Sequence, residues 1–202
     1  MKNRYLPTTC IADAMGGHNT LDAAIKSMAK TAKLCGPAFT VKMTPGDNLA
    51  LLRGIEAAKP GDVLVVDAGD YTKRTIAGDF VVGLMQVLGI AGLVTNGCVR
   101  DCEGIAATNF PVFCRAVTPA ASTKNNLGEI QTLISCGGVA VAPGDTVVAD
   151  CDGIVVVPQA RTEMVFAKAA EKLSTDETRA KTYLATPETA RQYLQQMLAR
   201  CK

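Results

Sequence analysis

Three charged side chains bracket a mostly apolar stretch of the chain. Asp79 stands at its start, and Arg100 and Asp101 stand at its end. An arginine can hold a carboxylate through two parallel hydrogen bonds, and carboxylate oxygens are the ligands that Mg²⁺ prefers. An adjacent Arg–Asp pair is equally typical of an ion pair beside a helix cap, and Asp79 of a helix N-terminus. A binding site and a purely structural role therefore both remain open for these residues.

A helix followed by a buried strand is predicted between the charges. Residues 79–88 carry apolar side chains at helical spacing and end at Gly89. Residues 90–95 form a short apolar run, which the turn dipeptide Asn96–Gly97 closes. A second short helix is predicted to begin at Asp101.

This arrangement places both groups of charges where ligands commonly bind. Asp79 would begin a helix, so the backbone N–H groups of Phe80 and Val81 would be donors for an anionic ligand. Arg100 and Asp101 would follow a buried strand, and ligands of open α/β sheets bind beyond the carboxyl ends of strands.

The rest of the chain alternates between helix and strand signals, which indicates an α/β fold. Further helices are expected near Thr8 and Thr9, which can cap the first, and after Asp47 or Asn48, either of which can cap the second. Others are expected from Gln159 and from near Pro187. Further strands are expected at 36–43, 62–69, 111–117, 138–143, 145–150 and 153–158. We expect a single domain over residues 1–202, with a core at about 8–160 and C-terminal helices at about 159–202.

Composition narrows the classes of function. The 202 residues carry a net charge of +2 without a basic run, so we expect no nucleic-acid partner. No apolar run approaches the roughly 20 residues that span a bilayer, and no signal peptide is recognisable, so we expect no membrane partner and a cytoplasmic location. The eight cysteines lack a C-x-x-C pair, and His18 is the only histidine. Reduced cysteines within the core are therefore expected, rather than a zinc site.

Several segments together resemble one known family. Asp79, twenty intervening residues and then Arg100–Asp101 form a D-x20-R-D arrangement. Over about residues 8–160 the chain is similar to the RraA-like family, which includes class II 4-hydroxy-4-methyl-2-oxoglutarate aldolases and related oxaloacetate decarboxylases. The other similar segments are TTCIADAMGG, GPAFTVKMTPGDN, KPGDVLVVDAG, FPVFCRAVTPA and GGVAVAPGDTVVADCDGIVVVP.

The resemblance implies a fold, an assembly and a set of residue roles. The expected fold is a compact α/β/α domain with a central β-barrel-like sheet, assembled as a trimer or hexamer with active sites between subunits. Asp101 would bind a divalent cation, Mg²⁺ or Mn²⁺, directly, and Asp79 would bind it through water. Arg100 would hold the carboxylate or keto oxygen of a 2-oxo acid, and the N–H groups of Phe80 and Val81 would meet the substrate carboxylate.

The reaction implied is cleavage of a carbon–carbon bond in a 2-oxo acid to give pyruvate, by an aldolase, a decarboxylase or both. The alternative is a non-catalytic regulator that binds and inhibits a ribonuclease, as some family members do. Lys124 and Asn125, in a loop where family members vary, are candidates for substrate choice. Asp150 and Asp152 have a cation-like D-x-D spacing, but a hairpin turn is the favoured interpretation.

Overall fold

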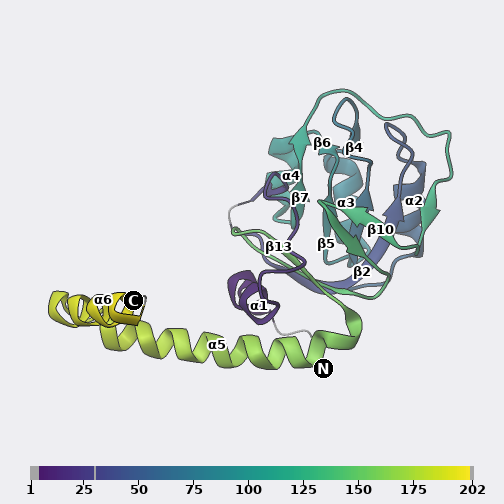
Figure 1. Cartoon of the computed structure of the whole chain (residues 1–202). Coiled ribbons are helices and arrows are strands. Elements are labelled where there is room, and N and C mark those ends of the chain that lie inside the picture. The colour runs from purple at the N-terminus through teal and green to yellow at the C-terminus, as the bar shows by residue number, and fades with distance from the viewer. Residues whose placement is uncertain (1–4, 30, 201–202) are drawn as a thin grey trace.

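The computed structural model describes residues 5–29 and 31–200, which form a curled-sheet body with a two-helix extension (Figure 1). The main sheet has the order β1-β7-β5-β3-β2-β12-β13, and β9 pairs with β2 at the side. Its strands are β1 (Lys26–Ser27), β2 (Leu34–Lys42), β3 (Val63–Asp67), β5 (Gly92–Thr95), β7 (Val112–Cys114), β9 (Glu129–Ile130), β12 (Thr146–Ala149) and β13 (Ile154–Val157).

The long strand β2 makes the sheet curl. Residues 34–37 pair with β12 in antiparallel register, whereas residues 38–42 pair with β3 in parallel register. Strands β2, β3, β5 and β7 are parallel to one another, so their carboxyl ends share one edge. The continuous apolar sequence of β3 is explained by burial on both faces of the sheet.

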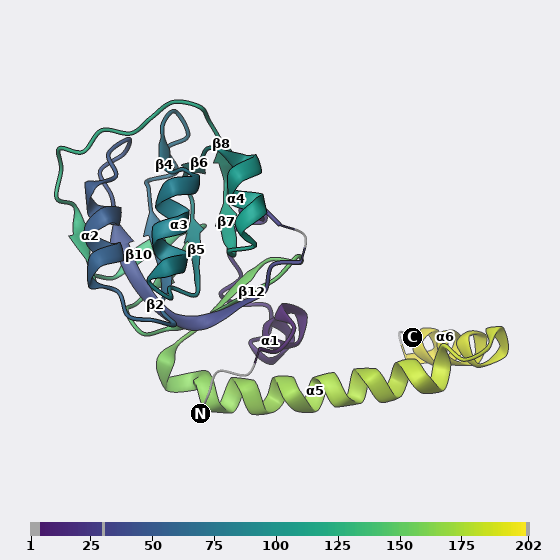
Figure 2. The ribbon, with the colours of Figure 1, turned by 180° about the vertical axis from the view of Figure 1, so that it is seen from behind.

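The described residues also form six α-helices and one 3-10 turn. They are α1 (Thr8–Ala14), α2 (Leu49–Ala57), α3 (Asp79–Val87), α4 (Cys102–Thr108), the 3-10 turn Gln159–Arg161, α5 (Thr162–Tyr183) and α6 (Pro187–Arg200). Helices α2, α3 and α4 cover one face of the sheet (Figure 2). Along β3, Leu64 and Val66 pack toward these helices, whereas Val63 and Val65 belong to a second core on the other face.

A second, smaller sheet lies beyond the carboxyl ends of the main strands. It contains the parallel strands β4 (Thr75–Ala77), β6 (Cys98–Val99) and β8 (Ala116–Val117), in the order β4-β6-β8. The hairpin β10 (Ile134–Cys136)–β11 (Val139–Val141) forms a separate pair.

Each short strand continues the path of a main strand after a break. Strand β4 follows β3, β6 follows β5 and β8 follows β7. At the β5–β6 break, a Cβ on Gly97 would lie 2.7 Å from the Cβ of Ala68, so only glycine fits there without rearrangement. The predicted strand at 111–117 is accordingly two strands separated at Arg115, and the sequence analysis did not predict β6.

The first helix differs from its prediction in how it is capped. It begins at Thr8 as expected, but the N-cap position is Pro7 and makes no side-chain cap. The carboxylate of Asp150 accepts the Thr8 N–H at 3.0 Å instead. The cap therefore comes from a residue 142 positions away, which local sequence signals do not reveal.

The C-terminal helices leave the body. Val165 and Ala169 of α5 are buried near α1, whereas no residue of α6 is buried. The rings of Tyr183 and Tyr193 stack with centroids 4.3 Å apart, which holds α6 back against α5. The two views show this extension standing clear of the sheet (Figures 1 and 2).

The described cysteines are free, and Cys10, Cys98, Cys114 and Cys136 are buried, which confirms the prediction of reduced core cysteines. Cys201 lies outside the described residues. No helix within residues 5–29 and 31–200 combines the length and the apolar character needed to cross a membrane.

Candidate functional site

The small parallel sheet brings the predicted site residues together. Gly78 and Asp79 follow β4, and Arg100 and Asp101 follow β6, its hydrogen-bonded neighbour. The Arg100 N–H donates to the Ala77 carbonyl at 3.0 Å, which aligns the two strand ends. Because parallel strands end at the same edge, residues separated by about twenty positions in sequence meet at one place.

Two glycines make room for the two carboxylates. A Cβ added to Gly78 would overlap Oδ2 of Asp101 and would lie 3.3 Å from Nε of Arg100. A Cβ added to Gly104 of α4 would lie 2.6 Å from Oδ2 of Asp79. Each carboxylate therefore lies against a glycine of the opposite segment, and substitution of either glycine would displace it.

Asp101 has an unusual backbone conformation. Its φ of 57° and ψ of 47° are left-handed, a conformation that costs most residues roughly 1–2 kcal/mol and that aspartate tolerates better than most. It occupies the N-cap position of α4, yet its side chain makes no capping hydrogen bond. The structural role considered for this residue, a helix cap, is therefore not what its carboxylate does, and 43% of the side chain is exposed.

Arg100 is held beside Asp101 without a complete hydrogen bond. Its Nε lies 3.3 Å from Oδ2 of Asp101, an ion-pair distance. The same Nε is buried and, among the described residues, has no partner with hydrogen-bond geometry. Buried donors are nearly always paired in folded proteins, and the acceptor within reach of this atom is Oδ2 of Asp101.

One carboxylate oxygen of Asp79 accepts a hydrogen bond from the next residue. Its Oδ1 accepts the Phe80 N–H at 2.6 Å, and the side chain is otherwise exposed at the start of α3. The Phe80 amide, expected to be free for a substrate carboxylate, is therefore engaged by Asp79 in this structure. A substrate role for the Phe80 and Val81 amides stays a prediction.

The donor set at this edge suits a hard divalent cation. Asp79 and Asp101 offer carboxylate oxygens, the ligands that Mg²⁺ and Mn²⁺ favour. Among the described residues, only Asp150, Cys151 and Asp152 form a group of three side chains that could hold a metal ion together. The candidate site offers few protein ligands. This small number fits the expectation that Asp101 is the one direct protein ligand and that water and substrate fill the other positions.

The Asp150 group is a structural feature instead. The Asp150 carboxylate accepts hydrogen bonds from Tyr5 Oη at 2.7 Å, Thr8 Oγ1 at 2.6 Å and the Asp152 N–H at 3.0 Å. Asp150 also pairs with Gly153 across the turn that joins β12 and β13, which confirms the predicted hairpin turn. Burial alone would raise the pKa of Asp150, but the hydrogen bonds lower it below its ordinary value.

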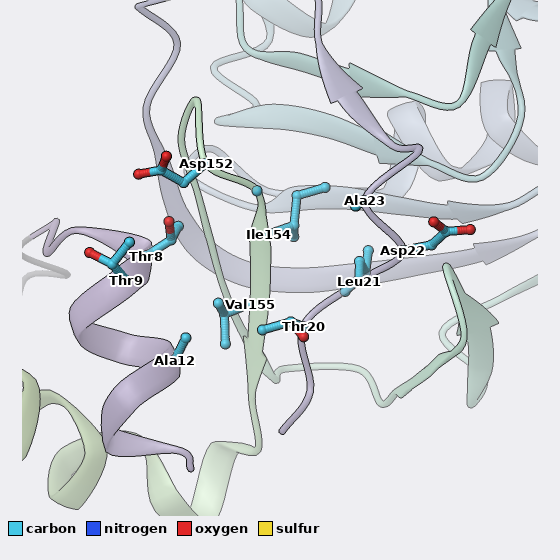
Figure 3. Close-up of a pocket in the computed structure, with 11 residues that line it drawn as sticks. Thr8, Thr9, Ala12, Thr20, Leu21, Asp22, Ala23, Asp152, Ile154 and Val155 are labelled. Carbon is cyan, nitrogen blue, oxygen red and sulfur yellow. The ribbon is translucent and has the colours of Figure 1, made fainter. Parts of the chain in front are cut away.

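A hollow of about 260 Å³ lies next to this turn, away from the candidate site. Figure 3 shows α1 on one side of it, and β13 with residues 20–23 on the other. Asp22 at its edge already pairs with Arg115 at 2.7 Å. The hollow therefore has no part in the arrangement of Asp79, Arg100 and Asp101. His18 is exposed in the turn after α1.

The residues that surround the site were not predictable from local sequence signals. Gly78 directly precedes Asp79, and Gly104 lies three residues after Asp101. In a sequence, however, a single glycine does not distinguish close packing from flexibility. Asp47 and Asn48 were considered only as helix caps, and their contacts with β4 and with the loop after β8 join segments far apart in sequence.

Comparisons with known proteins show which proteins the chain is similar to. The RraA-like family model, described as Aldolase/RraA, matches residues 8–156. A relative from Halalkalibacterium halodurans, named "Putative 4-hydroxy-4-methyl-2-oxoglutarate aldolase", is 46% identical over 96% of this chain and 93% of its own length.

Solved structures show the same fold. An uncharacterised protein from Pseudomonas syringae pv. tomato superposes with a TM-score of 0.81 at 28% identity, covering 92% of each chain. The RNA-processing inhibitor RraA from Thermus thermophilis superposes with a TM-score of 0.70 at 30% identity, covering 77% of this chain and 94% of its own. The expected fold class is thereby confirmed, and the chain belongs to the RraA-like family.

Proposed function

We propose that the protein is a divalent-metal-dependent lyase that cleaves a carbon–carbon bond of a 2-oxo acid and releases pyruvate. The observation that carries the proposal is the meeting of Asp79, Arg100 and Asp101 at one sheet edge, where the Asp101 carboxylate makes no helix cap and pairs with Arg100 Nε at 3.3 Å without hydrogen-bond geometry. The aldolase names of relatives support this reaction class at the level of the family.

The three side chains have different roles in binding the substrate and the metal ion. Arg100 binds the carboxylate or keto oxygen of the substrate, because a guanidinium matches such oxygens with paired donors. Asp101 would hold Mg²⁺ or Mn²⁺, and Asp79 would hold a water beside the ion. When bound, the ion supplies positive charge that favours the enolate form of the oxo acid.

Two substrates can use the same arrangement. In both, the bond between C3 and C4 breaks, its electron pair stays on the pyruvate fragment, and C3 then takes up a proton. A carbinol C4 loses its hydroxyl proton and leaves as a carbonyl compound, whereas the C4 carboxylate of oxaloacetate leaves as carbon dioxide. Arg100 holds the common 2-oxo-acid end, so aldol cleavage and decarboxylation require no change in its position.

We further propose a homo-oligomer, a trimer or hexamer, with the site between subunits. Phe80, Leu84, Val87 and Leu88 form an exposed apolar stripe on α3, and Phe80 and Val87 are 76% and 86% exposed. The stripe begins beside Asp79, so a second copy covering it would also close the open side of the candidate site. Light scattering on the purified chain tests this assembly, and a monomer would contradict it.

The direct test measures pyruvate release with lactate dehydrogenase as the coupling enzyme. Oxaloacetate and a panel of 4-hydroxy-2-oxo acids are offered with Mg²⁺ or Mn²⁺. We expect pyruvate from at least one of them, loss of activity with EDTA, and recovery when the ion is restored. Failure to release pyruvate from every member of the panel would refute the proposed reaction.

A ribonuclease regulator is the second candidate. It is favoured by the structural likeness to the RNA-processing inhibitor from Thermus thermophilis. The two functions separate experimentally, because loss of the Arg100 guanidinium should abolish pyruvate release without altering a protein-binding surface elsewhere. Inhibition of a ribonuclease by a chain that releases no pyruvate from the panel would favour the regulator.

A further inference from the structure

Asp47 is a buried carboxylate outside the candidate site, and the proposed reaction does not use it. It lies just before α2 and is 2% exposed. Its Oδ2 accepts the Asn125 N–H at 2.6 Å and the Thr123 hydroxyl at 2.7 Å. Its Oδ1 accepts the N–H groups of Leu49 at 3.2 Å and Asn126 at 3.3 Å. This carboxylate therefore anchors residues 123–126 to the start of α2.

The anchored residues belong to the loop 118–128, which follows β8 and passes over the carboxyl edge of the small sheet (Figure 1). The loop itself contacts both strands that carry the candidate site. The Thr118 N–H donates to the Val99 carbonyl of β6 at 3.0 Å, and the Thr75 N–H of β4 donates to the Ala120 carbonyl at 2.8 Å. The position of this loop is thus coupled to the carboxyl end of β6 and to the start of β4.

A second connection runs from the same place to β4. Asn48, 5% exposed, donates from Nδ2 to the Ile76 carbonyl at 2.9 Å. Ile76 lies two residues before Gly78 and three before Asp79. The start of α2 therefore holds β4 directly through Asn48, and indirectly through Asp47 and the loop.

We propose that Asp47 is a positioning residue of the candidate site, acting through the loop 118–128 to align the ends of β4 and β6. The proposal rests on the proposed function for its catalytic consequence. Most of residues 120–128 are exposed, so they have few packing contacts of their own to fix the loop. The buried carboxylate oxygens of Asp47 accept hydrogen bonds from this loop and fix its position. The position matters because a shift of about 1 Å in a catalytic group can lower the rate roughly 10²-fold.

The ionisation of Asp47 agrees with this role. Burial would raise its pKa, but the hydrogen bonds from Asn125, Thr123, Leu49 and Asn126 outweigh burial and hold the pKa far below its ordinary value. The carboxylate therefore stays ionised, and the loop stays anchored, throughout the neutral pH range.

Asp47→Asn tests the proposal, and Asp150→Asn is its matched control. Both residues are buried carboxylates that accept several hydrogen bonds, but Asp150 holds α1 and the β12–β13 turn rather than the candidate site. In Asp47→Asn an amide group replaces one acceptor and cannot receive the same N–H and O–H donors. Hydrogen exchange, kcat and KM are measured for both variants well below their unfolding midpoints.

We expect Asp47→Asn to lower kcat by about 10-fold or more with a smaller change in KM, because the binding groups remain and only their alignment is lost. We also expect faster amide exchange in residues 75–82 and 98–104. Asp150→Asn should leave kcat within about twofold and leave exchange in these segments unchanged. Unchanged exchange in Asp47→Asn, or equal changes in both variants, would overturn the proposal.

The exchange measurement keeps the two proposals separate. If the wild type releases no pyruvate, the proposed function fails, but faster exchange at 75–82 and 98–104 in Asp47→Asn alone would still establish Asp47 as a positioning residue. If the wild type is active while Asp47→Asn exchanges and turns over normally, the positioning role fails and the proposed function stands.

Discussion

Two acidic groups of this protein differ in how fully their oxygens are used. Asp150, Cys151 and Asp152 lie close enough to resemble a metal site, with potential ligand atoms within 4.8 Å of one another. The Asp150 carboxylate is nevertheless committed to Tyr5, Thr8 and Asp152. The Asp101 carboxylate, by contrast, makes no helix cap and lies beside a partly unsatisfied arginine.

The difference shows that proximity of carboxylates is a poor guide to binding. A carboxylate saturated by protein donors already has its charge compensated, so a cation gains little there. The Asp101 carboxylate makes no cap and pairs only with Arg100, so its other oxygen stays available for a ligand. This contrast supports the proposal that Asp79, Arg100 and Asp101 form the reactive site, whereas the hydrogen bonds of Asp150 give it a structural role.

The largest expected effect comes from Arg100→Ala. Pyruvate release should fall by roughly 10²–10³-fold, because loss of one aimed electrostatic donor typically costs that much. The coupled lactate dehydrogenase assay measures it, with circular dichroism confirming that the variant is folded. Equal activity in wild type and Arg100→Ala would move the reaction away from this edge and remove the contrast with Asp150.

Asp101→Asn should act on the metal requirement. A neutral amide binds a divalent cation more weakly than a carboxylate does, so we expect the Mn²⁺ concentration for half-maximal activity to rise by about 10-fold or more. Titration of the EDTA-treated variant with Mn²⁺ measures this change. If Asp152→Asn shifted the Mn²⁺ titration as strongly as Asp101→Asn, the proposed difference between Asp101 and the Asp150–Asp152 group would be wrong.

Asp150→Asn should lower stability rather than activity. Loss of its buried acceptors is expected to reduce the free energy of unfolding by about 1–3 kcal/mol at neutral pH, measured by urea denaturation. The folded pKa of Asp150 lies below its unfolded value, so the ionised carboxylate stabilises the fold above about pH 4. This contribution is lost as the pH falls through the folded pKa.

The stability difference between wild type and Asp150→Asn should therefore narrow between pH 7 and pH 3. The matched measurement is urea denaturation of both proteins at the two pH values. A difference that stays constant or widens toward acid pH would contradict the assignment of an ionised, hydrogen-bonded Asp150.

The smallest effect is expected from Asp152→Asn. The side chain is exposed, and the hydrogen bond to Asp150 comes from the backbone N–H of Asp152, which the substitution retains. Activity should stay within about twofold and the free energy of unfolding within about 0.5 kcal/mol. A clear loss of activity or of metal response in this variant would revive the second acidic group as a functional site.

Much of the fold was predictable because its signals are local. Apolar periodicity placed α3, and the continuous apolar run at 62–69 placed β3, which spans Val63–Asp67. The breaks after main strands were harder to predict. The sequence pattern indicates only a turn at Gly97, where β6 follows, and one continuous strand across Arg115, where β7 and β8 are separate. Strands of two residues, such as β6 and β8, carry almost no periodic signal.

By itself, the sequence determined which side chains can do chemistry and the family to which they belong. Asp79, Arg100 and Asp101 were identifiable from their types, their spacing and the segments around them. Only the tertiary structure decided how they meet. Parallel pairing of β4 with β6 brings their strand ends together, and the absent side chains of Gly78 and Gly104 leave the space that two carboxylates occupy. The tertiary structure also distinguished Asp101 from Asp150, because hydrogen-bond saturation depends on partners that lie far away in the sequence.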